Sequence, residues 1–364
     1  MFDNVFNNKN VIVTGHTGFK GTWLSLWLSQ LGANVTGISN VVPTNPSIYD
    51  SLGLSKLVND KRLDIRNLDA LKKEVLESQP DFVFHLAAQP IVSLSYHDPI
   101  ETLSTNIMGT ANLLESLRGL TKKCTSVIIT SDKCYDNVEW EWGYKESDHL
   151  GGKDIYSGSK GAAELVFKSY FNSFFKQLPN HRLVSARAGN VIGGGDWGKD
   201  RIVPDCMKAW STESKVEIRS PASTRPWQHV LEPISGYLNL ATHLDSNNNI
   251  NGESFNFGPR SDYSHNVKKL INDLRKTWNI EKHQAYAITD DIKFHEASLL
   301  KLNCDKALFY LKWLPTLNYE QLINFTGNWY YEFYKKRHNM LQVTVDQIRD
   351  YVNIAKSNNI PWTH

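Results

Sequence analysis

A short apolar run that leads directly into a glycine-rich turn is the feature that most constrains this chain. Residues 10–14 (NVIVT) are rich in β-branched side chains, and Gly15, Gly18 and Gly21 follow them before an amphipathic stretch over 20–32. This pattern predicts a strand, a tight turn and a helix. Glycines there let the backbone approach a pyrophosphate, which the helix N-terminus then faces. An ordinary strand-to-helix turn is the alternative.

The same alternation continues along the chain. A second strand is expected at 34–39, and the continuous apolar runs at 79–88 and 125–131 predict strands that are buried on both faces. Helical patterns lie between these strands, so we predict an α/β fold with a doubly wound, Rossmann-like parallel sheet. After 183–188 the pattern loosens, and a smaller C-terminal α/β domain is expected.

Composition excludes several classes of function. The chain has 40 Lys plus Arg and 38 Asp plus Glu, a net charge of +2, so no nucleic-acid partner is expected. Four cysteines without a CxxC pair argue against a disulfide framework and favour a reduced, cytoplasmic setting. We expect no membrane span, because no apolar run approaches the roughly 20 residues needed, and no signal peptide, because the start is polar. The 12 histidines show no metal-ligand spacing, and no metal is expected.

The end of the second strand leaves the choice of cofactor open. A dinucleotide fold normally places an acidic residue there to hold the adenosine ribose of NAD, or an arginine for NADP. Here the residues are Ile38, Ser39 and Asn40, so Ser39 offers only a neutral hydrogen bond. The second strand therefore does not decide between NAD and NADP.

A second motif carries catalytic groups. Tyr156 and Lys160 stand at i and i+4 near the start of an amphipathic stretch, which places both on one helix face. A lysine beside a tyrosine favours the phenolate, so we expect a lowered pKa and a base at Tyr156. Ser131 ends a buried strand, where doubly wound folds bind their ligands.

The GxxGxxG spacing, Ser131 and the YxxxK motif, in this order, resemble the extended short-chain dehydrogenase/reductase superfamily. The resemblance covers most of the chain and implies a nicotinamide cofactor. Asp64 could instead cap the following helix, and the small residues after the strand at 79–88 could reflect tight packing alone. The implied cofactor-binding residues are Gly15, Thr17, Gly18, Phe19, Lys20, Gly21, Ser39, Asp64, Ile65, Leu86, Ala87, Ala88, Gln89, Asn106, Tyr156 and Lys160.

The residues after Ser131 separate the chemistries within that superfamily. Here they are Asp132 and Lys133, and the segments SDKCYDN, GNVIGGGDWGKDRIVPD and RPWQHVLEP together resemble the CDP-glucose 4,6-dehydratase family. That resemblance implies bound NAD and a nucleotide-sugar substrate. A solvated ion pair is the alternative reading of Asp132 and Lys133. Rival functions are a 4-epimerase, a dehydratase of another nucleotide sugar, or a non-catalytic dinucleotide-binding regulator.

The implied reaction assigns a role to each catalytic residue. Tyr156 takes the proton of the sugar 4-hydroxyl, and the resulting ketone acidifies the hydrogen on C5. Lys133 removes that proton while Asp132 protonates the departing C6 hydroxyl. We therefore expect a raised pKa for Asp132 and a lowered pKa for Lys133, with Ser131 and Lys160 completing the catalytic set.

For the substrate, the planar guanidinium of Arg225 suits phosphate oxygens, although an exposed loop charge is the alternative. By resemblance, Asn190, Arg201 and Tyr237 are further substrate-binding candidates. We expect residues 1–185 with 226–257 to form the dinucleotide-binding domain, and 186–225 with 258–364 the nucleotide-sugar-binding domain.

Three further expectations concern segments. The glycine run at 193–196 suggests a flexible turn near the substrate, and the run at 139–142 (EWEW) either lines the active site or packs on the surface. The stretches at 155–175 and about 103–117 carry apolar residues on more than one face, which predicts a homodimer through a four-helix interface.

Overall fold

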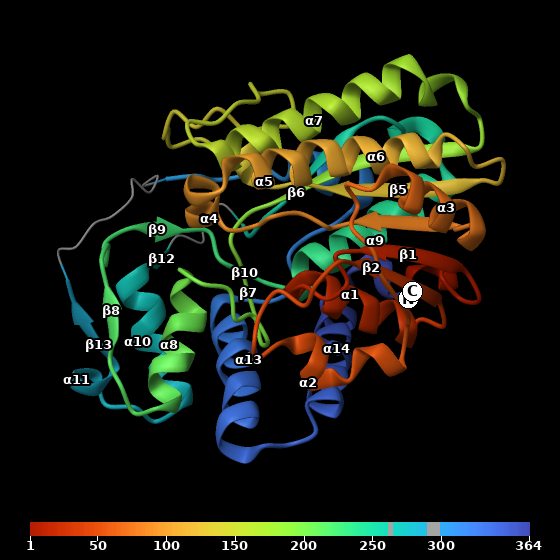
Figure 1. Cartoon of the computed structure of the whole chain (residues 1–364). Coiled ribbons are helices and arrows are strands. Elements are labelled where there is room, and N and C mark those ends of the chain that lie inside the picture. The colour runs from red at the N-terminus through yellow and green to blue at the C-terminus, as the bar shows by residue number, and fades with distance from the viewer. Residues whose placement is uncertain (261–264, 290–298) are drawn as a thin grey trace.

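A parallel sheet forms the centre of the molecule (Figure 1). The computed structural model describes residues 1–260, 265–289 and 299–364. Within them the strand order of this sheet is β11-β6-β5-β4-β1-β2-β3, and every neighbouring pair is parallel. The predicted doubly wound sheet is confirmed. Its strands are β1 (Asn10–Thr14), β2 (Asn34–Ser39), β3 (Asn59–Arg62), β4 (Phe82–His85), β5 (Cys124–Ile129), β6 (His181–Ala188) and β11 (Ser254–Phe257).

Both faces of the sheet are apolar, and each face packs into its own hydrophobic core. Successive side chains of a strand point to opposite faces. Val11 and Val13 of β1 therefore lie in one core, while Ile12 lies in the other. This is why the strands appear in the sequence as continuous apolar runs.

Helices cover both faces of the sheet (Figure 1). On one face lie α3 (Leu68–Ser78), α6 (Gly109–Leu117) and α7 (Ile155–Ser173), and on the other lie α1 (Phe19–Gln30) and α9 (Leu231–Ser246). The helix predicted over 103–117 is one helical stretch made of α5 (Pro99–Leu103), a π-helical segment (Ser104–Met108) and α6. The other helices are α2 (Ile48–Leu52), α4 (Val92–His97), α8 (Ile202–Ser211), α10 (Val267–Thr277), α11 (Lys282–Ala285), α12 (Asp305–Leu311), α13 (Tyr319–Tyr331) and α14 (Met340–Ser357).

A second group of elements gathers at one end of the molecule, at the left in Figure 1. It contains α8, α10, α11 and the parallel pair β8 (Val216–Ile218) and β13 (Tyr286–Ile288). Two further short pairs are β7 (Val191–Ile192) with β10 (Gln228–His229), and β9 (Thr224–Arg225) with β12 (His265–Asn266). Helix α14 packs against α1 and α2, although the predicted boundaries assign it to the C-terminal domain. The domain division itself stays a prediction.

The glycine run at 193–196 is buried and tightly packed. A β-carbon at Gly194 would lie 2.0 Å from the side chain of Trp329, and one at Gly195 would lie 2.5 Å from that of Ile48. The glycines therefore let the aromatic side chains of α13 approach the backbone. The expectation of a flexible turn does not agree with this packing.

The order of the strands positions the candidate site. The chain leaves β1 for β2 on one side and later returns to β4 on the other side of β1. Doubly wound sheets bind their ligands at such a switch point, outside the carboxyl ends of the strands. The glycine turn after β1 and the small residues after β4 meet there.

Candidate active site

The glycine turn after β1 has no room for larger side chains. Gly15 has a φ of +76°, and a β-carbon there would lie 2.7 Å from the backbone nitrogen of Ala87. Gly18 is the N-cap of α1, so the unpaired N–H groups of the first helical turn face out of the turn. Such a cradle fits the pyrophosphate of a dinucleotide. The predicted Thr17, Phe19 and Gly21 lie on the same turn.

Ser39 ends β2, where the adenosine ribose of a dinucleotide would lie. Its hydroxyl oxygen lies 3.0 Å from Nδ1 of His16, and Nε2 of His16 lies 2.9 Å from Oδ1 of Asp60. Burial lowers the pKa of His16, although Asp60 acts in the opposite direction. This contact was not predicted from the sequence. The only visible signal for it was a histidine inside the glycine turn.

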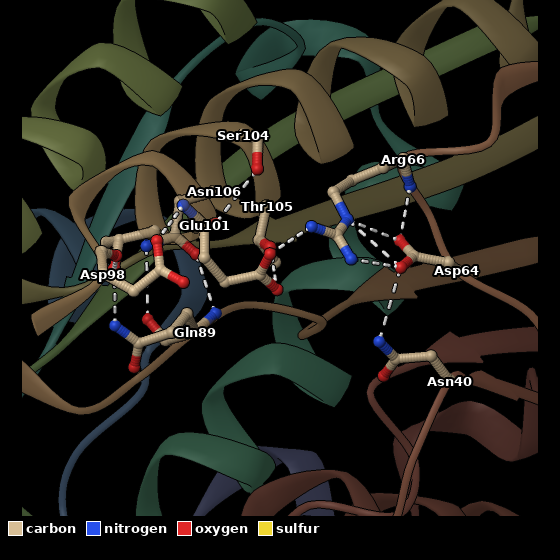
Figure 2. Close-up of polar contacts among 10 residues, drawn as sticks. Asn40, Asp64, Arg66, Gln89, Asp98, Glu101, Ser104, Thr105 and Asn106 are labelled. Carbon is tan, nitrogen blue, oxygen red and sulfur yellow. Dashed lines mark hydrogen bonds and ion pairs between the residues drawn. The ribbon is translucent and has the colours of Figure 1, made fainter. Parts of the chain in front are cut away.

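A second polar cluster lies beside the end of β2, as Figure 2 shows. The carboxylate of Asp64 accepts hydrogen bonds from the backbone N–H and the guanidinium of Arg66, which also pairs with Glu101 of α5. Nδ2 of Asn40 donates to Oδ2 of Asp64 at 3.5 Å. The hydrogen bonds from Arg66 lower the pKa of Asp64. Asn67 is the N-cap of α3, so the alternative of a helix cap at Asp64 is wrong.

Asn106 joins the segment after β4 to the helix that carries Tyr156. Its Oδ1 accepts a hydrogen bond from the backbone N–H of Gln89 at 2.8 Å (Figure 2). Its Nδ2 donates to Oγ of Ser159 at 2.8 Å. Ser159 in turn donates to the backbone oxygen of Tyr156 at 2.7 Å. The predicted Gln89 and Asn106 therefore set the position of the first turn of α7. Leu86 and Ala88 lie in the same segment after β4, and Ile65 packs against Gly109 of α6.

The predicted catalytic groups come together at the carboxyl end of β5. Tyr156 and Lys160 lie one turn apart on α7, and both are buried. Nζ of Lys160 lies 5.9 Å from the centre of the Tyr156 ring. Asp154 fixes the start of this helix, because its carboxylate accepts the backbone N–H of Ser157 at 2.9 Å. Ser131, directly beyond β5, interacts with the phenol of Tyr156.

The electrostatics of Tyr156 differ from the prediction. Burial raises the pKa of Tyr156 to about 12, and the Ser131 hydroxyl and the charge of Arg201 act in the opposite direction. Burial together with the charge of Lys20 lowers the pKa of Lys160 to about 8. The expectation that Lys160 brings the phenol close to neutrality is wrong for this structure, because burial disfavours the charged form of both groups.

Asp132 and Lys133 begin a short 3-10 turn (Asp132–Cys134) after Ser131. The Ser131 hydroxyl donates to Oδ1 of Asp132 at 2.9 Å and accepts the backbone N–H of Lys133 at 3.2 Å. Asp132 is only 3% exposed, which does not fit the alternative of a solvated ion pair. Burial raises the pKa of Asp132, as the sequence predicts, although Lys133 and Lys20 act to lower it.

Four charged residues interact with one another near the catalytic tyrosine: Lys20, Asp132, Asp196 and Arg201. Nη1 of Arg201, the N-cap of α8, lies 2.8 Å from Oδ2 of Asp196. Burial lowers the pKa of Lys20 to about 8, the charge of Arg201 adds to this effect, and Asp132 and Asp196 oppose it. Arg201, predicted to bind substrate, therefore lies at the catalytic end of the site. Lys20, predicted to bind cofactor, also lies within electrostatic reach of the catalytic acid. Sequence reasoning missed Asp196, which was visible only as the end of a glycine run.

The other predicted substrate residues lie on separate elements. Asn190 follows β6, and its backbone carbonyl accepts the N–H of Gln228 at 3.0 Å. Arg225 is half-buried in β9, where its Nη1 donates to the carbonyl oxygen of Thr224 at 2.9 Å. Tyr237 of α9 is 0% exposed. Its predicted role as a substrate contact stays a prediction.

The run at 139–142 lies on the surface. Trp140 and Trp142 are 39% and 67% exposed, and the ring of Trp140 packs against Tyr144 at 5.3 Å between centroids. Of the two alternatives, packing on the surface agrees with this arrangement.

Among residues 1–260, 265–289 and 299–364, no group of three or more His, Cys, Asp or Glu side chains is arranged to hold a metal ion. Within the same ranges, no helix has the length and apolar character required to cross a membrane.

The fold and the site define a member of the extended short-chain dehydrogenase/reductase superfamily. A family model described as GDP-mannose 4,6 dehydratase matches residues 12–326, and the chain belongs to this family. Over 354 residues, 96% of this chain and 98% of the relative, the chain is 43% identical to a CDP-glucose 4,6-dehydratase of Salmonella typhimurium. It is 26% identical over 301 residues to a CDP-paratose 2-epimerase of Salmonella typhi, covering 74% of this chain and 85% of the relative.

Solved structures share the fold. The epimerase Mth375 of Methanothermobacter thermautotrophicus superimposes with a TM-score of 0.77 at 22% identity, over 92% of this chain and 96% of that chain. The dTDP-glucose 4,6-dehydratase of Bacillus anthracis, solved in complex with NAD, superimposes with a TM-score of 0.74 at 18% identity, over 92% and 99%. These similarities show the architecture, and the chemistry follows from the residues of the site.

Proposed function

We propose that this protein is an NAD-dependent CDP-glucose 4,6-dehydratase, a hydro-lyase that converts CDP-D-glucose to CDP-4-keto-6-deoxy-D-glucose and water. One observation carries the proposal. Asp132 and Lys133 directly follow Ser131, beside Tyr156 and Lys160, in a chain that is 43% identical to a CDP-glucose 4,6-dehydratase over nearly the whole of both chains. The identity of the base rests on that similarity alone.

The cofactor site is formed by the glycine turn after β1, the ends of β2 and β3, and the small residues after β4. NAD, when bound there, accepts a hydride from C4 of the sugar and later returns it to C6. Gly15 and Gly18 provide the cradle for the pyrophosphate, and Ser39 and Asp64 lie at the adenosine end. Lys160 is placed to hold the nicotinamide ribose beside Tyr156.

Tyr156 takes the proton of the 4-hydroxyl as hydride leaves C4. Because burial holds the pKa of this phenol at about 12, the phenolate needs stabilisation when the substrate is bound. The Ser131 hydroxyl supplies a hydrogen bond for this purpose when it turns from Oδ1 of Asp132 to the phenolate, and Arg201 supplies a positive charge. The resulting C4 ketone acidifies the hydrogen on C5.

Elimination then uses Lys133 and Asp132. Lys133, directly or through a water molecule, removes the C5 proton, and the electron pair of the broken C5–H bond forms the C5–C6 double bond as the C6 hydroxyl leaves. Asp132 donates its own proton to that hydroxyl group, which departs as water, and Asp132 is left as a carboxylate. Burial of Asp132 suits this role, because it keeps the carboxyl group protonated at a higher pH. The product is complete when the hydride is returned to C6 and the proton held by Lys133 is returned to C5.

A panel of nucleotide glucoses tests the proposal. Purified protein with NAD should convert CDP-glucose to a 4-keto product without net formation of reduced cofactor. Conversion of a different nucleotide sugar would point to another dehydratase, and a product that retains its C6 hydroxyl with inverted C4 would point to an epimerase. A non-catalytic regulator would convert none of them.

We also propose a homodimer formed through α7 and the helical stretch of α5 and α6. Exposed apolar side chains support it: Ile100 is 72%, Met108 53% and Leu165 56% exposed, and all belong to these helices. Such a surface is typical of subunit contacts. Light scattering should report a dimer at micromolar concentration, and a monomer would contradict the proposal. The cytoplasmic location stays a prediction.

A further inference from the structure

Two buried polar atoms beside the catalytic strand have no hydrogen-bond partner within the described residues. They are Oδ2 of Asp132 and the hydroxyl of Tyr237. The two residues are 3% and 0% exposed. Buried polar groups in folded proteins are nearly always hydrogen-bonded to protein or to ordered water, so each of these atoms requires a partner.

The two atoms belong to one cluster. Phe257, which packs against the Tyr237 ring, pairs with Ala188 of β6, the residue before Gly189. The charge of Asp132 also adds to burial in raising the pKa of Tyr237. Tyr237 projects from α9 and packs edge-on against Phe257, at the carboxyl end of β11. A β-carbon on Gly189, just beyond β6, would lie 3.0 Å from Oδ2 of Asp132. The two carboxyl oxygens of Asp132 thus have different surroundings, because Oδ1 accepts the hydroxyl of Ser131.

We propose that Tyr237 is a positioning residue for Asp132, and that its hydroxyl donates a hydrogen bond to Oδ2 of Asp132 through one bridging water molecule. The phenol supplies a donor and Oδ2 an acceptor, which together satisfy both atoms. This proposal depends on the proposed function at one point, because that function makes Asp132 the acid of the elimination. A proton carried on Oδ2 faces the substrate, while the remaining lone pair of Oδ2 accepts from the water.

The link lowers the pKa of Asp132 and so opposes the effect of burial. A hydrogen bond donated to a carboxylate favours its charged form and lowers the pKa, whereas burial raises it. Other groups with electrostatic influence on Asp132 come from each neighbouring element: Lys133 and Cys134 from its own turn, Lys20 from α1 and Tyr156 from α7. Tyr237 adds a neutral hydrogen-bond donor from α9.

Infrared difference titration without substrate tests the link directly. The carboxyl band of Asp132 is identified by its absence in Asp132→Asn. In Tyr237→Phe the pKa of Asp132 should rise by about 0.5 to 1 unit, because a donor to the carboxylate is lost. Tyr237→Met, which also lacks the hydroxyl, should give the same shift. Tyr351→Phe removes a buried hydroxyl that donates to Glu232, away from Asp132, and should give no shift.

Activity provides a second readout. Asp132 acts as an acid only when protonated, so the loss of turnover at high pH should move upward in Tyr237→Phe by the same amount. The first hydride transfer should keep its rate. An unchanged pKa of Asp132, or an equal loss in both steps, would overturn the proposal. Since the infrared titration uses no substrate, failure on CDP-glucose would overturn the proposed function and leave this link standing.

Discussion

Arg187 of β6 and Glu164 of α7 form a fully buried ion pair, with 2.8 Å between Nη2 and Oε2. Thr130 and Ser185 also donate hydrogen bonds to the carboxylate of Glu164. Nη1 of Arg187 donates to the hydroxyl of Tyr135 at 2.7 Å, directly after the turn that carries Asp132 and Lys133. The pair therefore ties the helix of Tyr156 to the turn of the catalytic acid.

Removing one partner of this pair should destabilise the protein strongly. Arg187→Met leaves the carboxylate of Glu164 buried without its cation, which typically costs about 3 to 5 kcal/mol. The free energy of unfolding from urea titration measures this loss. The double variant Arg187→Met with Glu164→Met should be more stable than the single variant. A single variant as stable as the parent protein would contradict the prediction.

The same pair predicts a change in the pH dependence of stability. Burial raises the pKa of Glu164, but the charge and hydrogen bonds of Arg187 outweigh it and bring the pKa below its ordinary value. The pair therefore stabilises the parent protein above the unfolded pKa of about 4.3, and that stability is lost as the pH falls through the folded pKa. In Arg187→Met the hydrogen bonds from Thr130 and Ser185 still lower the pKa of Glu164, but burial is the largest effect. The sign should therefore reverse, and stability should fall as the pH rises above about 4.3. Urea midpoints between pH 4 and 7 distinguish the two cases.

Lys133→Met should separate oxidation from elimination. With Tyr156 and Lys160 intact the first hydride transfer proceeds, but the C5 proton lacks its base, which typically costs about 100-fold to 10,000-fold in rate. Absorbance of the reduced nicotinamide should then accumulate while product formation nearly stops, and C5 should exchange little solvent deuterium. Tyr156→Phe should show neither absorbance nor product. Near-normal turnover of Lys133→Met would show that Lys133 is not the base for the C5 proton.

Asp132→Asn should be distinguishable from Lys133→Met. Reduced cofactor should again accumulate, because the proton donor for the departing hydroxyl is missing. C5 should exchange more deuterium than in Lys133→Met, because Lys133 is retained. Mass spectrometry of recovered substrate measures this difference, and equal exchange in both variants would contradict the separate roles.

Retention of NAD should be weak. Ser39 offers the ribose no carboxylate, and a hydrogen bond to a charged group contributes about 1.5 to 3 kcal/mol where one exists. The Ser39 hydroxyl is also within hydrogen-bond distance of His16. Exhaustive dialysis should therefore remove the cofactor, and added NAD should restore activity. Stoichiometric NAD released by denaturing the dialysed protein would count against this expectation.

Lys20 should make cofactor binding depend on pH. Its pKa of about 8 means that its positive charge is present below that pH and is lost above it. Affinity for the anionic pyrophosphate should accordingly fall as the pH rises past 8. Lys160 titrates near the same pH, so the comparison with Lys20→Met isolates the contribution of Lys20. Calorimetric titration with NAD should show a weaker and flatter pH dependence in Lys20→Met, whereas Lys20→Arg should keep its affinity to higher pH.

The sheet and the order of catalytic residues could be predicted because they depend on local patterns. Buried strands appear as apolar runs, and the i and i+4 spacing of Tyr156 and Lys160 fixes their shared helix face. Helix boundaries were less well predicted, since no local signal marks the π-helical segment between α5 and α6.

Interactions between distant segments could not be predicted from the sequence. Tyr237 lies in an apolar helical stretch, and nothing near it in the sequence shows that its hydroxyl reaches the region of Asp132. Burial raises the pKa of Tyr156, and one of the groups that oppose this effect is Arg201, a residue that tertiary structure alone brings near. The lowered pKa of Asp64 likewise depends on hydrogen bonds from its neighbour Arg66. The orientation of Arg66 toward Glu101 follows from the packing of α5.

The pairing of β6 with β11 has a consequence for protein synthesis. Strand β11 begins at Ser254, long after β6 ends at Ala188, and most of the intervening chain builds other parts of the molecule. Until that strand leaves the ribosome, β6 has an open edge with unpaired backbone groups, which is a template for association with other chains. Products truncated before residue 254 should therefore aggregate, whereas nascent chains extended past 257 can close the sheet.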